Sequence, residues 1–143
     1  MIYFFDTSAL VKIYHREDGT DIVLPIYKSD DLIFISELSK LEFISTIHRK
    51  FRNKEISNNI LKALKEKFLA DTYRRIRILP LTSLLLDIAV DLIAEHGESR
   101  HLVTLDAIQL ATYSPLADSA VFTCGDIRLN TLAKQIGFSI LEV

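Results

Sequence analysis

Short β-rich runs alternate with longer segments of helical spacing along the whole chain. The β-rich runs are residues 2–5, 32–35, 76–79, 119–123 and 139–143. The helical segments are residues 8–15, 20–29, 36–53, 57–73, 83–96, 104–114 and 127–136. Strands that are separated by helices need crossover connections, which produce a parallel sheet with helices on both faces. The alternation therefore predicts an α/β fold with three layers, α/β/α, around a parallel sheet of four to five strands.

Helix-capping residues agree with these boundaries. The expected N-caps are Ser36, Ser57, Ser83 and Thr104, and the expected helix ends are Gly97 and Gly137. We find no internal repeat, no low-complexity segment and no linker. Residues 1–143 are therefore expected to form a single domain.

Composition excludes several classes of protein. The longest apolar stretch, SLLLDIAVDLIA, contains Asp87 and Asp91, so it does not read as a membrane span, and no secretory signal is visible. Four glycines are too few, and too widely spaced, for a dinucleotide-binding or P-loop fingerprint. The single cysteine, Cys124, excludes an internal disulfide framework and is typical of a reducing compartment. We therefore expect a cytoplasmic protein without membrane contact.

The net charge of −2 conceals an uneven charge distribution. Residues 49–77 contain ten Lys or Arg and three acidic residues, a local charge of +7. This stretch is either the solvated face of two helices or a surface that attracts phosphate groups. In the second case the candidates for contact with the phosphate backbone of a nucleic acid are Arg49, Lys50, Arg52 and Lys54.

Four carboxylates lie in mostly apolar surroundings: Asp6, Glu42, Asp106 and Asp126. Each has a structural explanation, because Asp6 and Asp126 suit helix N-caps, Asp106 suits a first helical turn and Glu42 suits a polar stripe. However, Asp6 and Asp126 directly follow strands, and Glu42 lies early in the helix after the second strand. These three are expected at the carboxyl edge of the sheet, where ligands gather. Spacing alone does not place Asp106 at this edge. Its helix leads into a strand, so the helix would begin at the opposite edge of the sheet unless it is tilted.

Converging carboxylates repel one another in a cleft of low dielectric unless a cation compensates their charge. Oxygen ligands suit Mg²⁺ or Mn²⁺, which also bind substrate phosphates. The chemistry that follows is metal-assisted hydrolysis of a phosphodiester bond. The basic stretch would then attract the nucleic acid backbone toward the acids.

Four segments carry a likeness to a known family. They are YFFDTSALVKIYHREDGTD, LIFISELSKLEFISTIHRK, VTLDAIQLATY and VFTCGDIRLNTLAKQIGFSIL. In this order they resemble the opening strand with its Asp-Thr/Ser motif, the helix-borne Glu, the Asp-Ala-x-x-Leu-Ala helix and the closing strand with its Asp of PIN-domain ribonucleases. Within that family they look like the VapC-type toxins of toxin–antitoxin pairs.

The resemblance implies functional residues and partners. It assigns catalytic and metal-binding roles to Asp6, Glu42, Asp106 and Asp126, with Thr7 or Ser8 as a polar neighbour. It also implies that the helix carrying Asp106 begins at the cleft, which spacing alone did not show. The implied protein is an endoribonuclease toxin that uses Mg²⁺ or Mn²⁺, forms a homodimer through its helical face and binds an antitoxin that covers the cleft.

One position departs from the family's pattern and keeps other hypotheses open. Family members usually carry Thr or Ser two residues before the last Asp, where this chain has Cys124, with Thr123 one position further back. A hydroxyl group that supports Asp126 is therefore expected to be missing or displaced. The alternative is a non-catalytic PIN-fold domain that binds RNA or protein. A phosphotransfer domain is less well supported, because FFDTSAL lacks an Asp two positions after Asp6.

Overall fold

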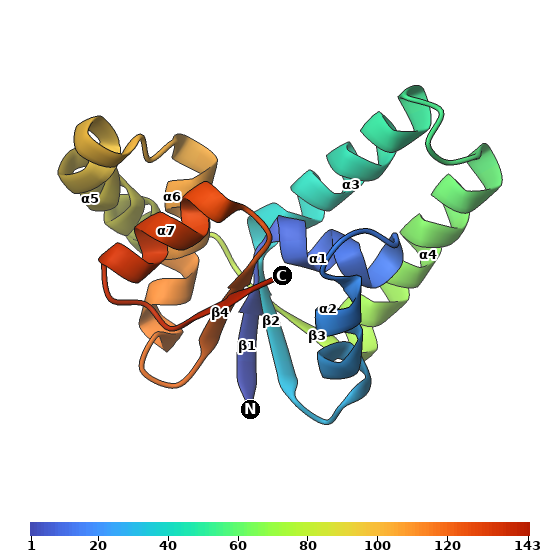
Figure 1. Ribbon diagram of the computed structural model, residues 1–143, viewed down its shortest axis with the longest axis horizontal. Coiled ribbons are helices and arrows are strands. Elements are labelled where there is room, and N and C mark those ends of the chain that lie inside the picture. The colour runs from blue at the N-terminus through green and yellow to red at the C-terminus, as the bar shows by residue number, and fades with distance from the viewer.

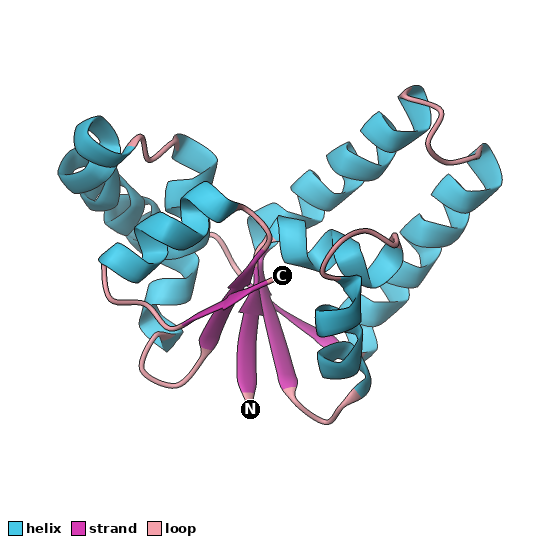
Figure 2. Cartoon of the chain, viewed as in Figure 1, coloured by secondary structure: helices cyan, strands magenta, loops and turns pink.

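The protein is a parallel sheet between two layers of helices (Figure 1, Figure 2). The structure is a computed structural model and describes residues 1–143. The strands are β1 (Ile2–Phe5), β2 (Leu32–Ser36), β3 (Ile76–Leu79), β4 (Val121–Cys124) and β5 (Ile140–Glu142). Their order in the sheet is β3-β2-β1-β4-β5, and every neighbouring pair is parallel. The predicted three-layer α/β fold is confirmed.

The helices divide between the two faces of the sheet in chain order (Figure 1). One face carries α1 (Thr7–Tyr14), α2 (Thr20–Lys28), α3 (Glu37–Arg52) and α4 (Asn58–Arg74). The other face carries α5 (Ser83–Arg100), α6 (Thr104–Tyr113) and α7 (Ile127–Gln135), and a short 3₁₀ turn, η1 (Ser114–Leu116), follows α6. None of these helices combines the length and the apolar character that crossing a membrane requires.

Each face of the sheet has its own apolar core because side chains alternate along a strand. Phe5 packs with Ile33, Ile35 and Phe43 under α1 to α4. Phe4, the neighbouring residue, packs on the other face, where its ring stacks on Phe122 at a centroid distance of 5.7 Å. Because β1 lies at the centre of the sheet and is covered on both faces, its sequence is a continuous apolar run.

The helix ends differ from prediction at three positions. Helix α5 continues through Gly97 to Arg100, and His101 takes the left-handed conformation that ends it (φ 53°). Thr82, not Ser83, caps α5 by accepting the N–H of Leu85 at 3.2 Å. Thr104 lies inside α6, whose N-cap position is occupied by Val103 without a side-chain hydrogen bond. Because consecutive Ser and Thr residues offer equivalent capping oxygens, the sequence alone did not separate Thr82 from Ser83.

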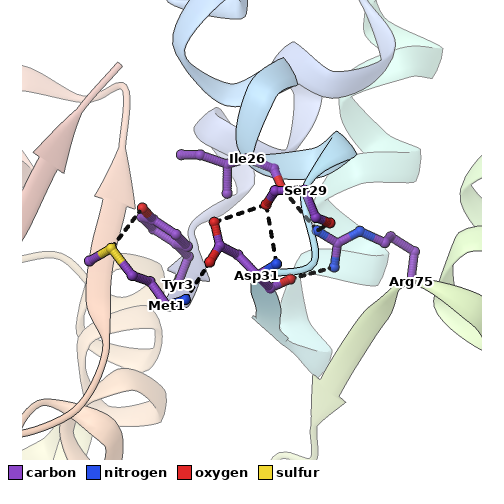
Figure 3. A network of polar contacts seen from close by, with 6 residues as sticks. All are labelled: Met1, Tyr3, Ile26, Ser29, Asp31 and Arg75. Carbon is purple, nitrogen blue, oxygen red and sulfur yellow. Dashed lines mark hydrogen bonds and ion pairs between the residues drawn. The ribbon is translucent and has the colours of Figure 1, made fainter.

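The amino-terminal edge of the sheet is held by a polar network around Arg75 (Figure 3). The Arg75 guanidinium donates to the carbonyl oxygens of Ile26 (2.9 Å), Tyr27 (2.8 Å), Ser29 (3.2 Å) and Asp31 (2.8 Å). The Asp31 carboxylate in turn pairs with the amino group of Met1 and accepts from Ser29 Oγ at 2.8 Å. One side chain therefore joins the end of α4 to the connection between α2 and β2.

Candidate functional site

Two of the predicted acids follow adjacent central strands at the carboxyl edge of the sheet. Asp6 comes after β1 and caps α1, because its Oδ1 accepts the N–H of Ala9 at 2.9 Å. Asp126 follows β4 after Gly125 and caps α7, because its Oδ1 accepts the N–H groups of Arg128 (2.8 Å) and Leu129 (3.0 Å). Their predicted capping role is confirmed. Because β1 and β4 are parallel, hydrogen-bonded neighbours, the two carboxylates lie at the same edge of the sheet.

A cleft of about 500 Å³ opens at this edge. Its lining includes two predicted acids, Glu42 and Asp126, and two predicted polar neighbours, Thr7 and Ser8. The remaining lining residues are Val11, Lys12, Glu17, Thr46, Arg49 and Lys50. Acidic and basic side chains therefore share one open cavity at the edge where ligands bind in parallel sheets.

Asp6 is the most buried of the four acids, with 6% of its surface exposed. Burial raises the pKa of its carboxyl group to about 6, against the hydrogen bonds from the Ala9 N–H and the Ser8 side chain, which lower it. Ser8 Oγ donates to Asp6 Oδ1 at 2.7 Å. A buried carboxylate without a paired cation is costly to ionise, so this position favours binding of a positive charge.

Glu42, on α3, is held by donors from two other helices. Its Oε2 accepts from Thr7 Oγ1 on α1, and from Gln109 Nε2 on α6 at 2.8 Å. Gln109 Nε2 also lies 3.0 Å from Ser39 Oγ and 3.2 Å from Thr7 Oγ1. The network joins the helices that begin after β1 and β2 to the helix that carries Asp106.

Asp106 lies at the start of α6 and pairs with Arg128 at the start of α7, with Nη2 and Oδ2 3.3 Å apart. Burial raises the pKa of Asp106, the Arg128 guanidinium opposes that rise, and the negative charges of Asp126 and Glu42 add to it. The charges of Glu42 and Asp126 therefore both act on Asp106. The start of α6 therefore faces the start of α7, and Asp106 is not among the residues that line the cleft.

The position where a hydroxyl was expected is occupied by the Cys124 sulfur. The Asp126 N–H donates to Cys124 Sγ at 3.2 Å, and Cys124 Sγ lies 3.8 Å from Ser8 Oγ. Thr123 is fully buried, and its Oγ1 has no hydrogen-bond partner, so it is not brought to the cleft. The Gly125 N–H donates to Ser8 Oγ at 2.7 Å. A side chain at residue 125 would be crowded, because its Cβ would lie 3.1 Å from Ser8 Oγ and 3.2 Å from the Val143 carbonyl oxygen.

The four basic candidates fall into two groups. Arg49 and Lys50 line the cleft, and Lys50 lies 3.3 Å from Glu55 and 3.8 Å from Glu17. The other two candidates are Arg52 and Lys54, which line a separate depression of about 580 Å³ beyond the end of α3. Of the four, Arg49 is thus the exposed cation that faces the acids.

Sequence reasoning missed three residues of this region. Lys12 lines the cleft, Arg128 pairs with Asp106, and Gln109 binds Glu42. One signal for Gln109 was present, because residues three apart on a helix share a face and Gln109 comes three residues after Asp106. No comparable signal pointed to Arg128, whose contact depends on how α6 and α7 pack.

The donor atoms at this edge fit a hard divalent cation by type and by charge. The four acids offer only oxygen, and the internal hydrogen bonds of Asp6, Glu42 and Asp126 fall on one oxygen of each carboxylate. In the present arrangement, however, no three acidic, His or Cys side chains come close enough together to hold a metal ion. Asp106, in particular, is engaged by Arg128.

Comparison with known proteins gives a family match and several similar folds. The family model described as PIN domain matches residues 3–134. No curated protein sequence matches the chain. The likeness to solved structures, at 14–17% identity, lies in the fold.

Three solved structures illustrate that likeness. FitAcB from Neisseria gonorrhoeae has a TM-score of 0.71 at 15% identity, with 99% of this chain and 97% of that chain covered. VapBC2 from Rickettsia felis, bound to a DNA fragment from its promoter, has a TM-score of 0.66 at 17% identity, covering 99% and 98%. A toxin–antitoxin complex from Klebsiella pneumoniae has a TM-score of 0.58 at 17% identity, covering 87% and 86%.

Proposed function

The chain belongs to the PIN domain family, and from this premise we propose that residues 1–143 form one nuclease domain that hydrolyses RNA phosphodiester bonds. The observation that carries the proposal is the gathering of acids at one edge of the sheet. Asp6 and Asp126 follow neighbouring strands, and Glu42 shares a cleft with Asp126. The charges of Glu42 and Asp126 both act on Asp106.

Mg²⁺ or Mn²⁺ is the proposed cofactor, with Asp6, Glu42, Asp106 and Asp126 as its ligands. When bound, such an ion activates a water molecule and stabilises the charge that develops on the phosphate and the leaving oxygen. The buried Asp6 supports this role, because a bound cation would offset the cost of ionising it. Arg128 would have to release Asp106 for that residue to serve as a ligand.

RNA is the proposed substrate, and the cationic side of the cleft supports its binding. Arg49 and Lys12 line the same cavity as Glu42 and Asp126. Their positive charges would attract the phosphate backbone that the acids alone would repel. Thr46, also in the lining, offers a hydroxyl to a sugar or phosphate oxygen.

The proposed biological role is that of a cytoplasmic toxin held in check by an antitoxin that covers the cleft, and we propose a homodimer formed through the helical face. The toxin–antitoxin complex from Klebsiella pneumoniae, with a similar fold, supports the antitoxin. Exposed apolar side chains on α5 support the homodimer, because Leu84 and Val90 are 68% and 64% exposed.

The test is cleavage of cellular RNA by the purified protein with Mn²⁺, with new RNA ends mapped by sequencing. We expect discrete cuts that disappear with a chelator and with the Asp6→Asn variant. The Asn side chain keeps the helix cap but removes the negative charge. Cuts that persist in both controls would assign the activity to another nuclease or another site.

The second candidate is a non-catalytic domain that keeps the fold and binds RNA or protein. The arrangement of the acids favours it, because no three of them form a ligand set and Asp106 is paired with Arg128. Calorimetry with Mn²⁺ separates the two candidates. A binding-only domain gives no Mn²⁺ titration that depends on Asp6, whereas a nuclease gives one that Asp6→Asn abolishes.

A further inference from the structure

Gln109 lies where α1, α3 and α6 meet. It is in α6, one turn after Asp106, and only 3% of its surface is exposed. Its side-chain nitrogen is within hydrogen-bond distance of oxygens on α1 (Thr7) and α3 (Ser39 and Glu42). A single amide group therefore links the helix that Asp6 caps, the helix that carries Glu42 and the helix that carries Asp106.

The orientation of this amide follows from hydrogen-bond chemistry. A carboxylate oxygen accepts hydrogen bonds but donates none, so the Gln109 nitrogen, not its oxygen, must face Glu42. The amide oxygen, Oε1, is buried and has no hydrogen-bond partner. A buried polar atom without a partner costs free energy. The orientation is therefore set by the contact with Glu42 and is not favoured by the surroundings of Oε1.

We propose that Gln109 is a positioning residue that orients the Glu42 carboxylate toward a divalent cation, an inference that rests on the proposed function. Gln109 and Thr7 both donate to Glu42 Oε2, so Oε1 is the oxygen that neither of these donors engages. The amide is neutral and donates without adding a positive charge that would compete with the cation. Groups that orient metal ligands in this way commonly strengthen metal binding without touching the metal.

A purely structural role for Gln109 makes a different prediction. If the amide only joined α6 to α1 and α3, its loss would lower the stability of the fold and leave Mn²⁺ affinity unchanged. The helix offers a matched control one turn on, at Thr112, which is 1% exposed. Thr112 donates to the Ile108 carbonyl at 2.7 Å and lies 3.3 Å from Ser36, so it makes no contact with Glu42.

The first measurement is calorimetry of Mn²⁺ binding to the full chain. We expect Gln109→Met, which keeps the length and loses the donor, to weaken Mn²⁺ binding by about 10-fold to 100-fold. Gln109→Asn keeps the amide but is one methylene too short to reach Glu42, and it should weaken binding in the same direction. Thr112→Val should leave the affinity unchanged. Thermal unfolding of each variant checks that the fold is intact.

The second measurement is a double-mutant cycle with Glu42→Gln. If Gln109 acts through Glu42, Gln109→Met causes no further loss of Mn²⁺ affinity once Glu42 is changed. Losses that multiply in the double variant would overturn the positioning role. So would a Gln109→Met variant that binds Mn²⁺ as the wild type does. A wild-type protein that binds no Mn²⁺ at any concentration would instead overturn the metal-dependent function, and the positioning role with it.

Discussion

Asp6 caps a helix and is also the most buried of the four proposed metal ligands. One carboxylate oxygen caps α1, and the group sits almost without exposure at the end of the central strand. Burial raises the pKa of Asp6 to about 6. The unfolded chain releases the same proton near pH 3.9. Without a bound cation, the stabilisation that comes from protonated Asp6 is complete below about pH 3.9 and is lost as the pH rises through about 6.

Asp6→Asn should therefore be more stable than the wild type in chelator at neutral pH. The expected difference in the free energy of unfolding is near zero at about pH 4 and grows to at most about 3 kcal/mol above about pH 6. Urea unfolding between pH 4 and pH 8 measures it. Adding Mn²⁺ to the wild type should reduce the gap, because a cation stabilises the ionised form. A difference that stays constant across this range would contradict the raised pKa.

At the scale of elements, Arg75 joins the connection between α4 and β3 to the connection between α2 and β2. Its planar guanidinium donates to four carbonyl oxygens at the end of α2 and the start of β2, and its Cζ lies 5.7 Å from the centre of the Tyr27 ring. A lysine ammonium has one nitrogen and cannot span these oxygens in the same geometry. The four hydrogen bonds of Arg75 hold the segment that enters β2. Strand β2 leads directly into α3, the helix that carries Glu42.

Arg75→Lys should lower the free energy of unfolding by about 2 to 3 kcal/mol, because several carbonyl oxygens lose a charged donor. Arg74→Lys is the matched control, since Arg74 is the exposed neighbour and should change stability by less than about 0.5 kcal/mol. Chemical denaturation of both variants measures the difference. Equal effects of the two substitutions would show that the four hydrogen bonds of Arg75 do not stabilise the fold.

For the whole molecule, the fold separates the charge that the sequence concentrates in residues 49–77. Arg49 faces the cleft, Arg52 lies beyond it, and Arg75 is used within the fold. A local charge of +7 therefore does not act as one surface. RNA that enters the cleft is expected to meet only the cations at its rim.

Arg49→Gln should weaken RNA binding for every sequence tested, whereas Arg52→Gln should not. With a chelator present to prevent cleavage, the slope of log affinity against log salt should fall by about 0.7 for one lost phosphate contact. Fluorescence titration of a single-stranded RNA at several salt concentrations measures this slope. The same loss from both variants would mean that RNA binds along the outside of α3 and not in the cleft.

The features that could be predicted from the sequence are those that depend on local chemistry. Asp6 and Asp126 were predicted as helix caps at strand ends, because strand, cap and helix are all local patterns. Gln109 and Arg128 were not, because their partners come from other helices and sequence spacing does not reveal how helices pack. Gly97 was expected to end a helix, but glycine is tolerated inside one, and α5 continues through it to Arg100.

The order of the acids along the chain also separates them in time. Translation delivers Asp6 and Glu42 early, but Asp126 arrives only after β4, the strand that must insert beside β1. Until that pairing forms, β1 has an open edge and the acids lack one member. The group of acids is therefore complete only after the carboxyl-terminal part of the chain has paired with β1.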